Sequence, residues 1–443
     1  MDQRHTPKTL PGFPIARDKW PIFGHMNAIL KGGREKLLEY TKELGPAFWL
    51  HMGFGNWAIH ISGPMAYEVM KNKKTRSVMS DPRFAHTLDH SMLVKDGNAH
   101  RKARASMNAP FTPRGLTATG VGEIIDEILR TELETWSEGM SLPLLDVTSR
   151  MALDVIFRIL GVPAEDLPEW RKHYDHFFTP GAMIPVDLPG TPLRRSKQAR
   201  RWLDQQFSRL LEKARAEGEQ ETMLGALAHA KDEQGQSMSE TELLANLRLL
   251  GFAGHETTAA IMGWMMLHAA QDPNIWDGLC EEANAMEGLP TSPKQLQHVP
   301  FAEALFRECL RLYPPVMLVS REVVEPLEVE HYVIPERTIV TASVVCLSMD
   351  PETYPEPMVM KPERWLGRER APSPTEAVQF GGGPHFCLGY HMAVLEGTFF
   401  MVYAARMLSE KGLRPSLAAN FPAPVYLPLT HPPQKIRVLF LAQ

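Results

Sequence analysis

The chain has 443 residues, of which 44% are hydrophobic and 22% are charged, as in a soluble globular protein. Lysine and arginine number 47 against 52 aspartates and glutamates. The balance argues against a nucleic-acid-binding protein, whose domains are usually strongly basic. The four scattered cysteines have no C-x-x-C spacing, which argues against a disulfide framework or a zinc ribbon. We expect a reduced, cytoplasmic monomer. We also expect no transmembrane anchor, because the most apolar stretch, 259–270, is too short to span a bilayer.

In chain order, residues 20–65 combine one short helix with two β-like runs, AFWLHMG (47–53) and WAIHIS (57–62). Residues 115–310 follow a helical pattern, in which Ile124, Ile128, Leu129 and Leu133 share one face. Short β-rich runs return at 320–346, and an irregular stretch follows to 380. Since no linker interrupts this order, we predict one mainly α domain with small β-sheets over residues 1–443, in which 1–19 form an N-terminal extension.

The best-defined helix is predicted over residues 239–271. Ser239 and Glu242 form an S-x-x-E capping box at its start, and Pro273 follows its end. Its middle reads GFAGHETTAA (251–260), where two glycines cost about 1 kcal/mol each relative to alanine. One interpretation is a kinked core helix whose threonines bond to the preceding turn. The other is a helix loosened beside a bound group.

A single cysteine, Cys387, closes the glycine-rich stretch FGGGPHFCLG (380–389). Leu388, Met392, Leu395 and Phe399 have helical spacing, so a helix begins at or just past the cysteine. Alone, Cys387 would be taken for an inert buried thiol. At a helix N-terminus a thiolate is stabilised, and glycines let backbone amides turn toward it. One thiolate with a flat macrocycle supplying the other ligands fits this pattern better than a tetrahedral metal site.

The same stretch matches the F-x-x-G-x-(R/H)-x-C-x-G haem loop of the cytochrome P-450 family at Phe380, Gly383, His385, Cys387 and Gly389. The chain resembles that family over nearly its whole length, in the soluble bacterial type with eukaryote-like features. The resemblance implies that Cys387 is the axial ligand of haem b, which lies between the long distal helix and the cysteine helix. It also implies haem contacts from His100, Arg104, Arg321, His385, Phe380, Gly381, Gly389 and Ala253.

The tetrapeptide ECLR (308–311) resembles the family's E-x-x-R motif, and PERW (362–365) follows at the family's distance. Glu308 and Arg311 lie three residues apart, hence on one helical face. Such a spacing usually marks an exposed ion pair. The resemblance instead implies a buried network of Glu308, Arg311 and Arg364 that fixes the core beneath the haem.

The segment AGHETT (253–258) resembles the family's distal-helix motif, A-G-x-(D/E)-T-(T/S). The family's chemistry needs a hydroxyl and an acid that deliver protons while the O–O bond breaks, roles that the resemblance gives to Thr257 and Glu256. Because both are present, we expect a monooxygenase. The alternatives are a haem-thiolate isomerase, a dehydratase or a peroxide-dependent enzyme, and a haem-binding sensor or carrier.

The resemblance also implies O₂ as co-substrate and electrons that come from NAD(P)H through a separate ferredoxin, or flavodoxin, and its reductase. A lipophilic substrate is expected, such as a terpenoid, steroid, retinoid, fatty acid or polyketide-like molecule. By position, the candidate pocket walls are Phe84, Leu93, Phe252, Ala253, Val316, Met317 and Val319. One departure from the family lies in HYVIPERT (331–338), where His331 and Arg337 replace glycines of a turn.

Overall fold

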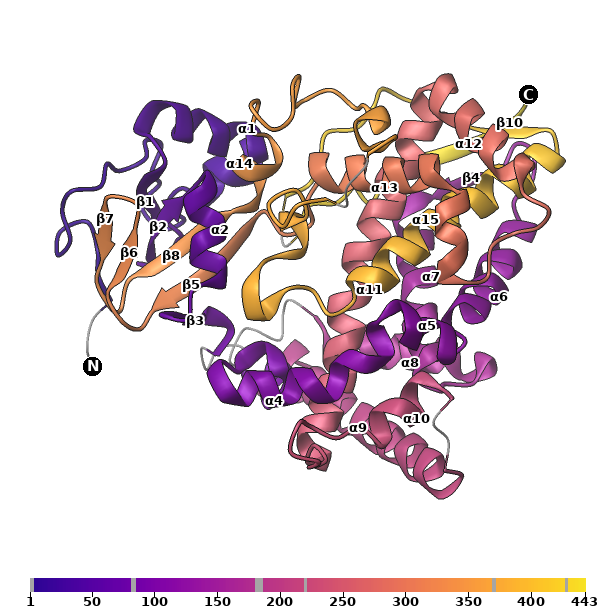
Figure 1. Ribbon diagram of the computed structural model, residues 1–443, viewed down its shortest axis with the longest axis horizontal. Helices are drawn as coiled ribbons and strands as arrows, with labels where there is room; N and C mark the ends of the chain where they lie inside the picture. The colour runs from indigo at the N-terminus through magenta and orange to yellow at the C-terminus, as the bar shows by residue number, and fades with distance from the viewer. Residues whose placement is uncertain (1–3, 81–84, 180–185, 219–220, 369–371, 427–428) are drawn as a thin grey trace. The chain divides into compact units, whose positions relative to one another are not determined.

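The computed structural model describes residues 4–80, 85–179, 186–218, 221–368, 372–426 and 429–443 (Figure 1). The chain folds into two compact units, each assembled from separate stretches of sequence. The first unit comprises Met1–Val78, Ala304–Cys387 and Asn420–Ile436, and the second comprises Met79–Glu303, Leu388–Ala419 and Arg437–Gln443. Because both units draw on early and late parts of the chain, no single cut separates them. The assignment of one haem domain with an N-terminal extension stays a prediction.

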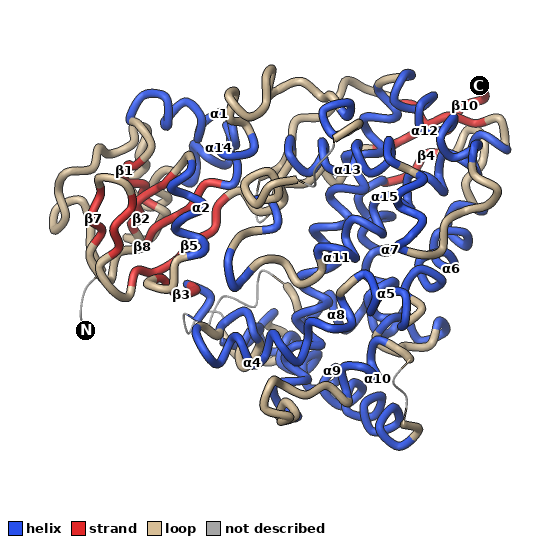
Figure 2. Tube along the Cα trace, viewed as in Figure 1, coloured by secondary structure: helices blue, strands red, loops and turns tan. Residues whose placement is uncertain are grey.

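The first unit is built around a five-stranded sheet (Figure 2). In spatial order its strands are β1 (Ala47–His51), β2 (Trp57–Ile61), β8 (Ile339–Ser343), β5 (Leu318–Val323) and β3 (Thr75–Ser77). Strands β2 and β8 are parallel, with Ile59 opposite Val340, and the other neighbours are antiparallel. The two β-like runs of the sequence are therefore confirmed as β1 and β2. Trp49, Ile59 and Val340 lie in the buried apolar core of this unit.

Helices and a hairpin complete the first unit. They are α1 (Met26–Leu44), α2 (Pro64–Lys71), α13 (Pro300–Leu312, of this unit from Ala304 on), α14 (Val344–Ser348) and the hairpin of β6 (Leu327–Val329) and β7 (Tyr332–Ile334). Helix α2 packs against β8, and α14 packs against α1. Helix α1 bends at Gly33, whose φ is +47° and whose missing side chain makes room for the ring of Tyr426.

In the segment 330–337, which lacks the family's glycines, two residues still adopt the left-handed backbone conformation. Glu330 has a φ of +51° in the β6–β7 hairpin, and Arg337 has a φ of +64°. The Arg337 N–H donates to the Val323 carbonyl at 2.7 Å. Arg337 thus adopts a conformation that glycine would adopt without steric cost.

The second unit is mainly helical. Its helices are α3 (Ala85–Leu88), α4 (Gly97–Asn108), α5 (Pro113–Ala118), α6 (Val121–Glu134), α7 (Leu144–Ile159), α8 (Leu167–Phe177), α9 (Pro192–Ala216), α10 (Met223–Ala228), α11 (Glu240–Gln271), α12 (Pro273–Ala285) and α15 (Tyr390–Glu410). A small antiparallel sheet joins β4 (Ser141–Pro143), β10 (Arg437–Ala442) and β9 (Leu413–Leu417). Figure 1 shows α7, α11 and α15 running beside one another, and α11 packs against both of the others.

The sequence pattern located these helices better than it located their buried faces. On α6, Leu129 and Leu133 are buried as predicted, but Ile125 takes the place expected for Ile124, and Ile128 is only half-buried. With 3.6 residues per turn, Ile124 and Ile125 lie on adjacent stripes of the helix, and the more deeply buried stripe contains Ile125. Within the described ranges, none of the helices combines the length and apolar character needed to cross a membrane.

Candidate functional site

The turn that carries Cys387 is shaped by packing against α2. Gly381 and Gly383 have φ values of +81° and +64°, which favour glycine. A Cβ on Gly382 would lie 2.8 Å from the Tyr67 ring, and one on Gly383 would lie 2.5 Å from the Lys71 Cα. The glycines therefore serve close approach to α2 as well as the turn itself. This second reason was not apparent from the sequence.

Cys387 is half-buried at the end of this turn and forms no disulfide. Its backbone N–H donates to the Phe380 carbonyl at 2.9 Å, so the backbones of these two predicted haem contacts are tied together across the turn. Helix α15 begins at Tyr390, three residues later, as the sequence indicated. A Cβ on Gly389 would meet no described atom within 4 Å.

Helix α11 begins and ends as the sequence predicts. Ser239 caps it, and Ser239 and Glu242 form the reciprocal capping box. Most of its central and C-terminal residues are buried, yet Ala253 is exposed, and Glu256 and Thr257 are half-buried. Residues at i, i+3 and i+4 share a helix face, so these three form one uncovered stripe of α11.

The glycines of α11 are explained by packing inside the second unit. A Cβ on Gly251 would lie 2.7 Å from the Tyr174 ring of α8, and one on Gly254 would lie 2.7 Å from the Ile156 side chain of α7. The helix is continuous from Glu240 to Gln271. The Thr257 hydroxyl donates to the Ala253 carbonyl at 2.9 Å, which is the back-bonding of the first interpretation. Close packing therefore gives the glycines a role that does not require a loosened helix.

Two further residues lie beside the acid of this helix. The His255 Nδ1–H donates to the Gly251 carbonyl at 2.7 Å, and burial lowers the pKa of this imidazole. The Tyr174 hydroxyl donates to the Arg248 carbonyl, and its ring meets the His255 ring at 5.6 Å and 90°. Burial first, and the Glu256 charge second, raise the pKa of Tyr174 well above its ordinary value. The sequence analysis missed Tyr174 because it is distant in the chain from the residues of α11.

Glu308, Arg311 and Arg364 meet in the first unit. Arg311 reaches Glu308 through Nε at 2.9 Å and Nη2 at 2.7 Å, and Arg364 Nε donates to Glu308 at 3.0 Å. Glu308 and Arg311 are fully buried. The Trp365 indole donates to Glu308 at 2.9 Å, and the Lys361 backbone N–H donates at 3.1 Å. The last two donors were not expected from the sequence, although Trp365 stands in the quoted PERW.

Four of the predicted haem contacts are histidines or arginines, and two of them lie in each unit. His100 is buried and Arg104 half-buried on α4, four residues apart and hence on one face. Arg321 is buried on β5, where its guanidinium donates to the Thr75 hydroxyl at 3.2 Å and the Thr75 carbonyl at 3.1 Å. His385 is half-buried at the end of a short 3₁₀ turn, Gly383–His385.

The candidate pocket walls fall into two groups. Leu93 and Phe252 are half-buried in the second unit, where Phe252 packs on the Phe178 ring at 4.2 Å. In the first unit Val316 is exposed, whereas Met317 is buried and Val319 packs against the apolar core. Phe84 lies outside the described residues. Burial of Met317 and Val319 favours a packing role for them.

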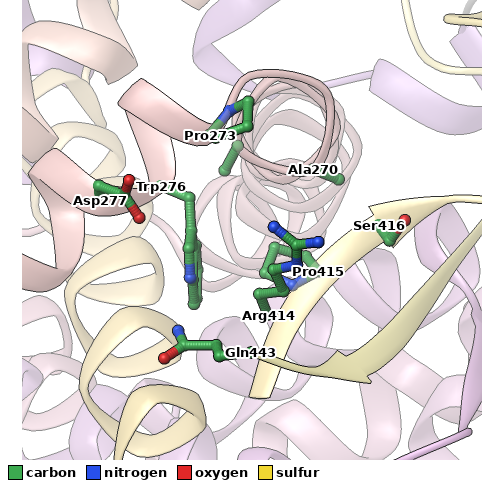
Figure 3. Close-up of a pocket in the computed structure, with 9 residues that line it drawn as sticks. Ala270, Pro273, Trp276, Asp277, Arg414, Pro415, Ser416 and Gln443 are labelled. Carbon is green, nitrogen blue, oxygen red and sulfur yellow. The ribbon is translucent and has the colours of Figure 1, made fainter. Parts of the chain in front are cut away.

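A surface cavity of about 350 Å³ lies in the second unit, at the end of α11. Figure 3 shows the rings and polar groups that line it, including Trp276, Asp277, Arg414 and Gln443. None of the predicted site residues lines this cavity.

The sequence matches one family model and curated relatives that carry the same family name. A family model for cytochrome P-450 matches residues 14–409. The cytochrome P-450 BJ-4 homolog of Sinorhizobium fredii is 34% identical over 428 residues, which is 96% of each chain. Cytochrome P-450 BJ-4 of Bradyrhizobium diazoefficiens is 33% identical over 441 residues, covering 99% of this chain and 98% of the relative.

Solved structures of the same family also match this chain. A cyanobacterial cytochrome P-450 with bound retinoic acid has a TM-score of 0.80 and 25% identity, over 98% of this chain and all of that one. The haem domain of cytochrome P-450DA has a TM-score of 0.83 over 97% of each chain; at 15% identity it bears on the fold alone. Fold and sequence together define a haem-dependent monooxygenase.

The chain belongs to the cytochrome P-450 family. The predicted mainly α fold with small sheets is confirmed. As a member, the protein is an oxidoreductase that uses haem iron and O₂, receives electrons from a redox partner and acts on a lipophilic molecule.

Proposed function

We propose that Cys387 is the axial ligand of haem b and that Thr257 and Glu256 deliver protons during monooxygenation. When bound, the haem supplies the activation of O₂ for insertion of one oxygen atom into the substrate. The single observation that carries the proposal is the turn 381–387, in which Gly382 and Gly383 pack against α2 and which ends at the half-buried Cys387. The uncovered stripe of α11 also suits a flat group.

The chain's own contribution to oxygen chemistry begins with Thr257. At rest its hydroxyl proton is used in the bond to the Ala253 carbonyl, while the oxygen keeps lone pairs that can accept. A proton arriving at that oxygen lets the hydroxyl release its own proton on the uncovered face of α11. Glu256 precedes it and is half-exposed, so its carboxylate can exchange protons with water and supply them to the threonine.

The ligand assignment is tested by the spectrum of the reduced protein under carbon monoxide. We expect the red-shifted band of a haem thiolate in the wild type and in Cys280→Ala, a variant of another half-buried free cysteine. The band should be absent in Cys387→Ala. A red-shifted band that survives Cys387→Ala would show that another residue holds the iron.

The proton role is tested with a matched pair of variants. Thr257→Val and Thr258→Val each remove a hydroxyl and keep the side-chain size, but Thr258 is buried whereas Thr257 lies on the uncovered stripe. We expect Thr257→Val to uncouple electron consumption from product and to release peroxide, and Thr258→Val to remain coupled. Equal coupling in both variants would place the proton path elsewhere.

For the substrate we propose a large lipophilic molecule, such as a terpenoid, steroid, retinoid, fatty acid or polyketide-like compound. The retinoic acid in the cyanobacterial relative and the aromatic pair of Phe252 and Phe178 support this class. A library screen for the substrate-induced spin-state shift tests it, and a response only to small polar compounds would contradict it.

We further propose that the protein works as a cytoplasmic monomer. None of the four cysteines, all of them in the described residues, forms a disulfide, which suits a reducing compartment. Electrons would come from NAD(P)H through a ferredoxin, or a flavodoxin, and its reductase. Turnover with each purified carrier distinguishes the two, and turnover with neither would refute this part of the proposal.

A further inference from the structure

The surface cavity at the end of α11 carries two opposite charges on its wall. Asp277 of α12 and Arg414 of β9 both line it. In Figure 3 the indole of Trp276 lies between these two side chains. Within the described part of the chain, neither charged side chain has an ion-pair or hydrogen-bond partner, and the two do not pair with each other. Both charges are therefore left for a bound group.

The end of the cavity formed by α11 and α12 is negative. The last carbonyls of a helix lack helical donors and carry partial negative charge. Ala269 and Ala270, in the last turn of α11, line the cavity. The fourth residue after Ala269 is Pro273, which has no N–H to donate to the Ala269 carbonyl. Pro273 and Asp277 stand four residues apart on α12 and share a face, so the carboxylate adds its charge at this end.

The side of the cavity formed by β9 and the residue after β10 carries the positive charge. The Arg414 guanidinium has N–H donors on each of its three nitrogens, and among the described residues none of them has an acceptor. Pro415 and Ser416, the neighbouring residues of β9 on this wall, have uncharged side chains. An anion complements this side, because a guanidinium can hold a carboxylate through two parallel N–H bonds.

We propose that this cavity binds a small aliphatic zwitterion, whose ammonium meets Asp277 and the end of α11 and whose carboxylate meets Arg414. The volume of about 350 Å³ is at the lower end of the range of small-molecule sites. Trp276, Pro273 and Pro415 offer apolar rings to the carbon chain between the two charges. A ligand with only one charge would leave the other charge of the cavity unused. The proposal is independent of haem ligation and of proton delivery, because it uses none of those residues.

Isothermal titration calorimetry of the holoprotein at low ionic strength tests the proposal. The three probes have the same carbon chain and differ in charge: 5-aminopentanoate carries both charges, pentanoate only the negative one and pentylamine only the positive one. We expect 5-aminopentanoate to bind about tenfold or more tightly than either of the others, because each of those lacks one charge-assisted contact.

Variants of the cavity assign each contact separately. Asp277→Asn should remove the advantage of 5-aminopentanoate over pentanoate, and Arg414→Gln should remove its advantage over pentylamine. The matched control is Glu281→Gln, which removes an exposed charge one turn further along α12, outside the cavity, and should leave the affinities of all three probes unchanged. Asp277 and Arg414 are also exposed, so the thermal midpoints of all three variants should match that of the wild type.

Several results would overturn the proposal. Equal affinities of the three probes for the wild type would show that the two charges do not act together. Tighter binding of pentanoate than of 5-aminopentanoate would make the cavity an anion site instead. Asp277→Asn and Arg414→Gln variants that bind like Glu281→Gln would place the ligand elsewhere, and no binding of any probe at millimolar concentration would show that the cavity takes no such ligand.

Discussion

Replacing Glu308 by glutamine should cost far more stability than a typical charge removal. Both carboxylate oxygens are already occupied by donors. Oε1 accepts from Arg311 Nη2, Arg364 Nε and the Lys361 N–H, and Oε2 accepts from Arg311 Nε and the Trp365 indole. A glutamine amide would therefore turn an NH₂ donor toward at least two other donors in either orientation.

The magnitude follows from burial. Glu308 and Arg311 have side-chain exposures of 0% each, so Glu308→Gln leaves a buried guanidinium without its counter-charge. Breaking such a pair costs about 3–5 kcal/mol, whereas an exposed pair contributes about 0–1 kcal/mol. The Arg311 bonds to the carbonyls of Ser348 and Pro357 remain and place the loss toward the lower end of this range. About 3 kcal/mol is still a large part of a total of about 5–15 kcal/mol.

Urea unfolding of the holoprotein, followed by circular dichroism and by the haem absorbance, measures the loss. Glu363→Gln is the matched control, because Glu363 is an exposed acid of the same segment whose carboxylate has no ion-pair or hydrogen-bond partner among the described residues. We expect the control to stay within about 0.5 kcal/mol of wild type, as a surface change. If Glu308→Gln stays within the same range, the buried network does not stabilise the fold and the argument is wrong.

Two further predictions follow from burial and backbone geometry. Burial raises the pKa of Glu396 to about 8, so the folded state keeps a proton that the unfolded state releases above about pH 4.5. The free energy of unfolding should therefore fall as the pH rises from about 4.5 to about 8. In unfolding measured at several pH values, Glu396→Gln should remove that dependence. The opposite sign would refute a buried neutral acid. Gly381→Ala should cost about 1 kcal/mol of backbone strain, whereas Gly383→Ala should cost clearly more because its Cβ meets the Lys71 Cα at 2.5 Å. Equal thermal midpoints and haem retention in the two variants would contradict the packing of the turn against α2.

Features that depend on neighbours in the sequence were predictable. The start of α11 at its capping box and its end before Pro273 both follow from short-range hydrogen bonding, and the structure has them where the sequence places them. The strands β1 and β2 were visible from their β-branched and aromatic composition. The cysteine turn was visible from its glycines.

What the sequence could not provide were contacts between distant segments. The glycines of α11 suggested a loosened helix, but Gly251 is required by the ring of Tyr174, which is 77 positions earlier and carries no motif. Trp365 joins Glu308 from 57 residues away for a similar reason. At Arg337 a distant contact acts in the opposite way and allows a residue other than glycine. Its tertiary hydrogen bond to Val323 holds a left-handed backbone conformation that arginine disfavours.

The Glu308 network also has an order of assembly during synthesis. The pair of Glu308 and Arg311 is local, so it can form once α13 has left the ribosome. Lys361, Arg364 and Trp365 are added to the chain only 53 to 57 residues later. Until then the carboxylate lacks three of its five donors and must keep water as a substitute. The buried core around Glu308 therefore closes in two stages, and the second waits for the late part of the chain.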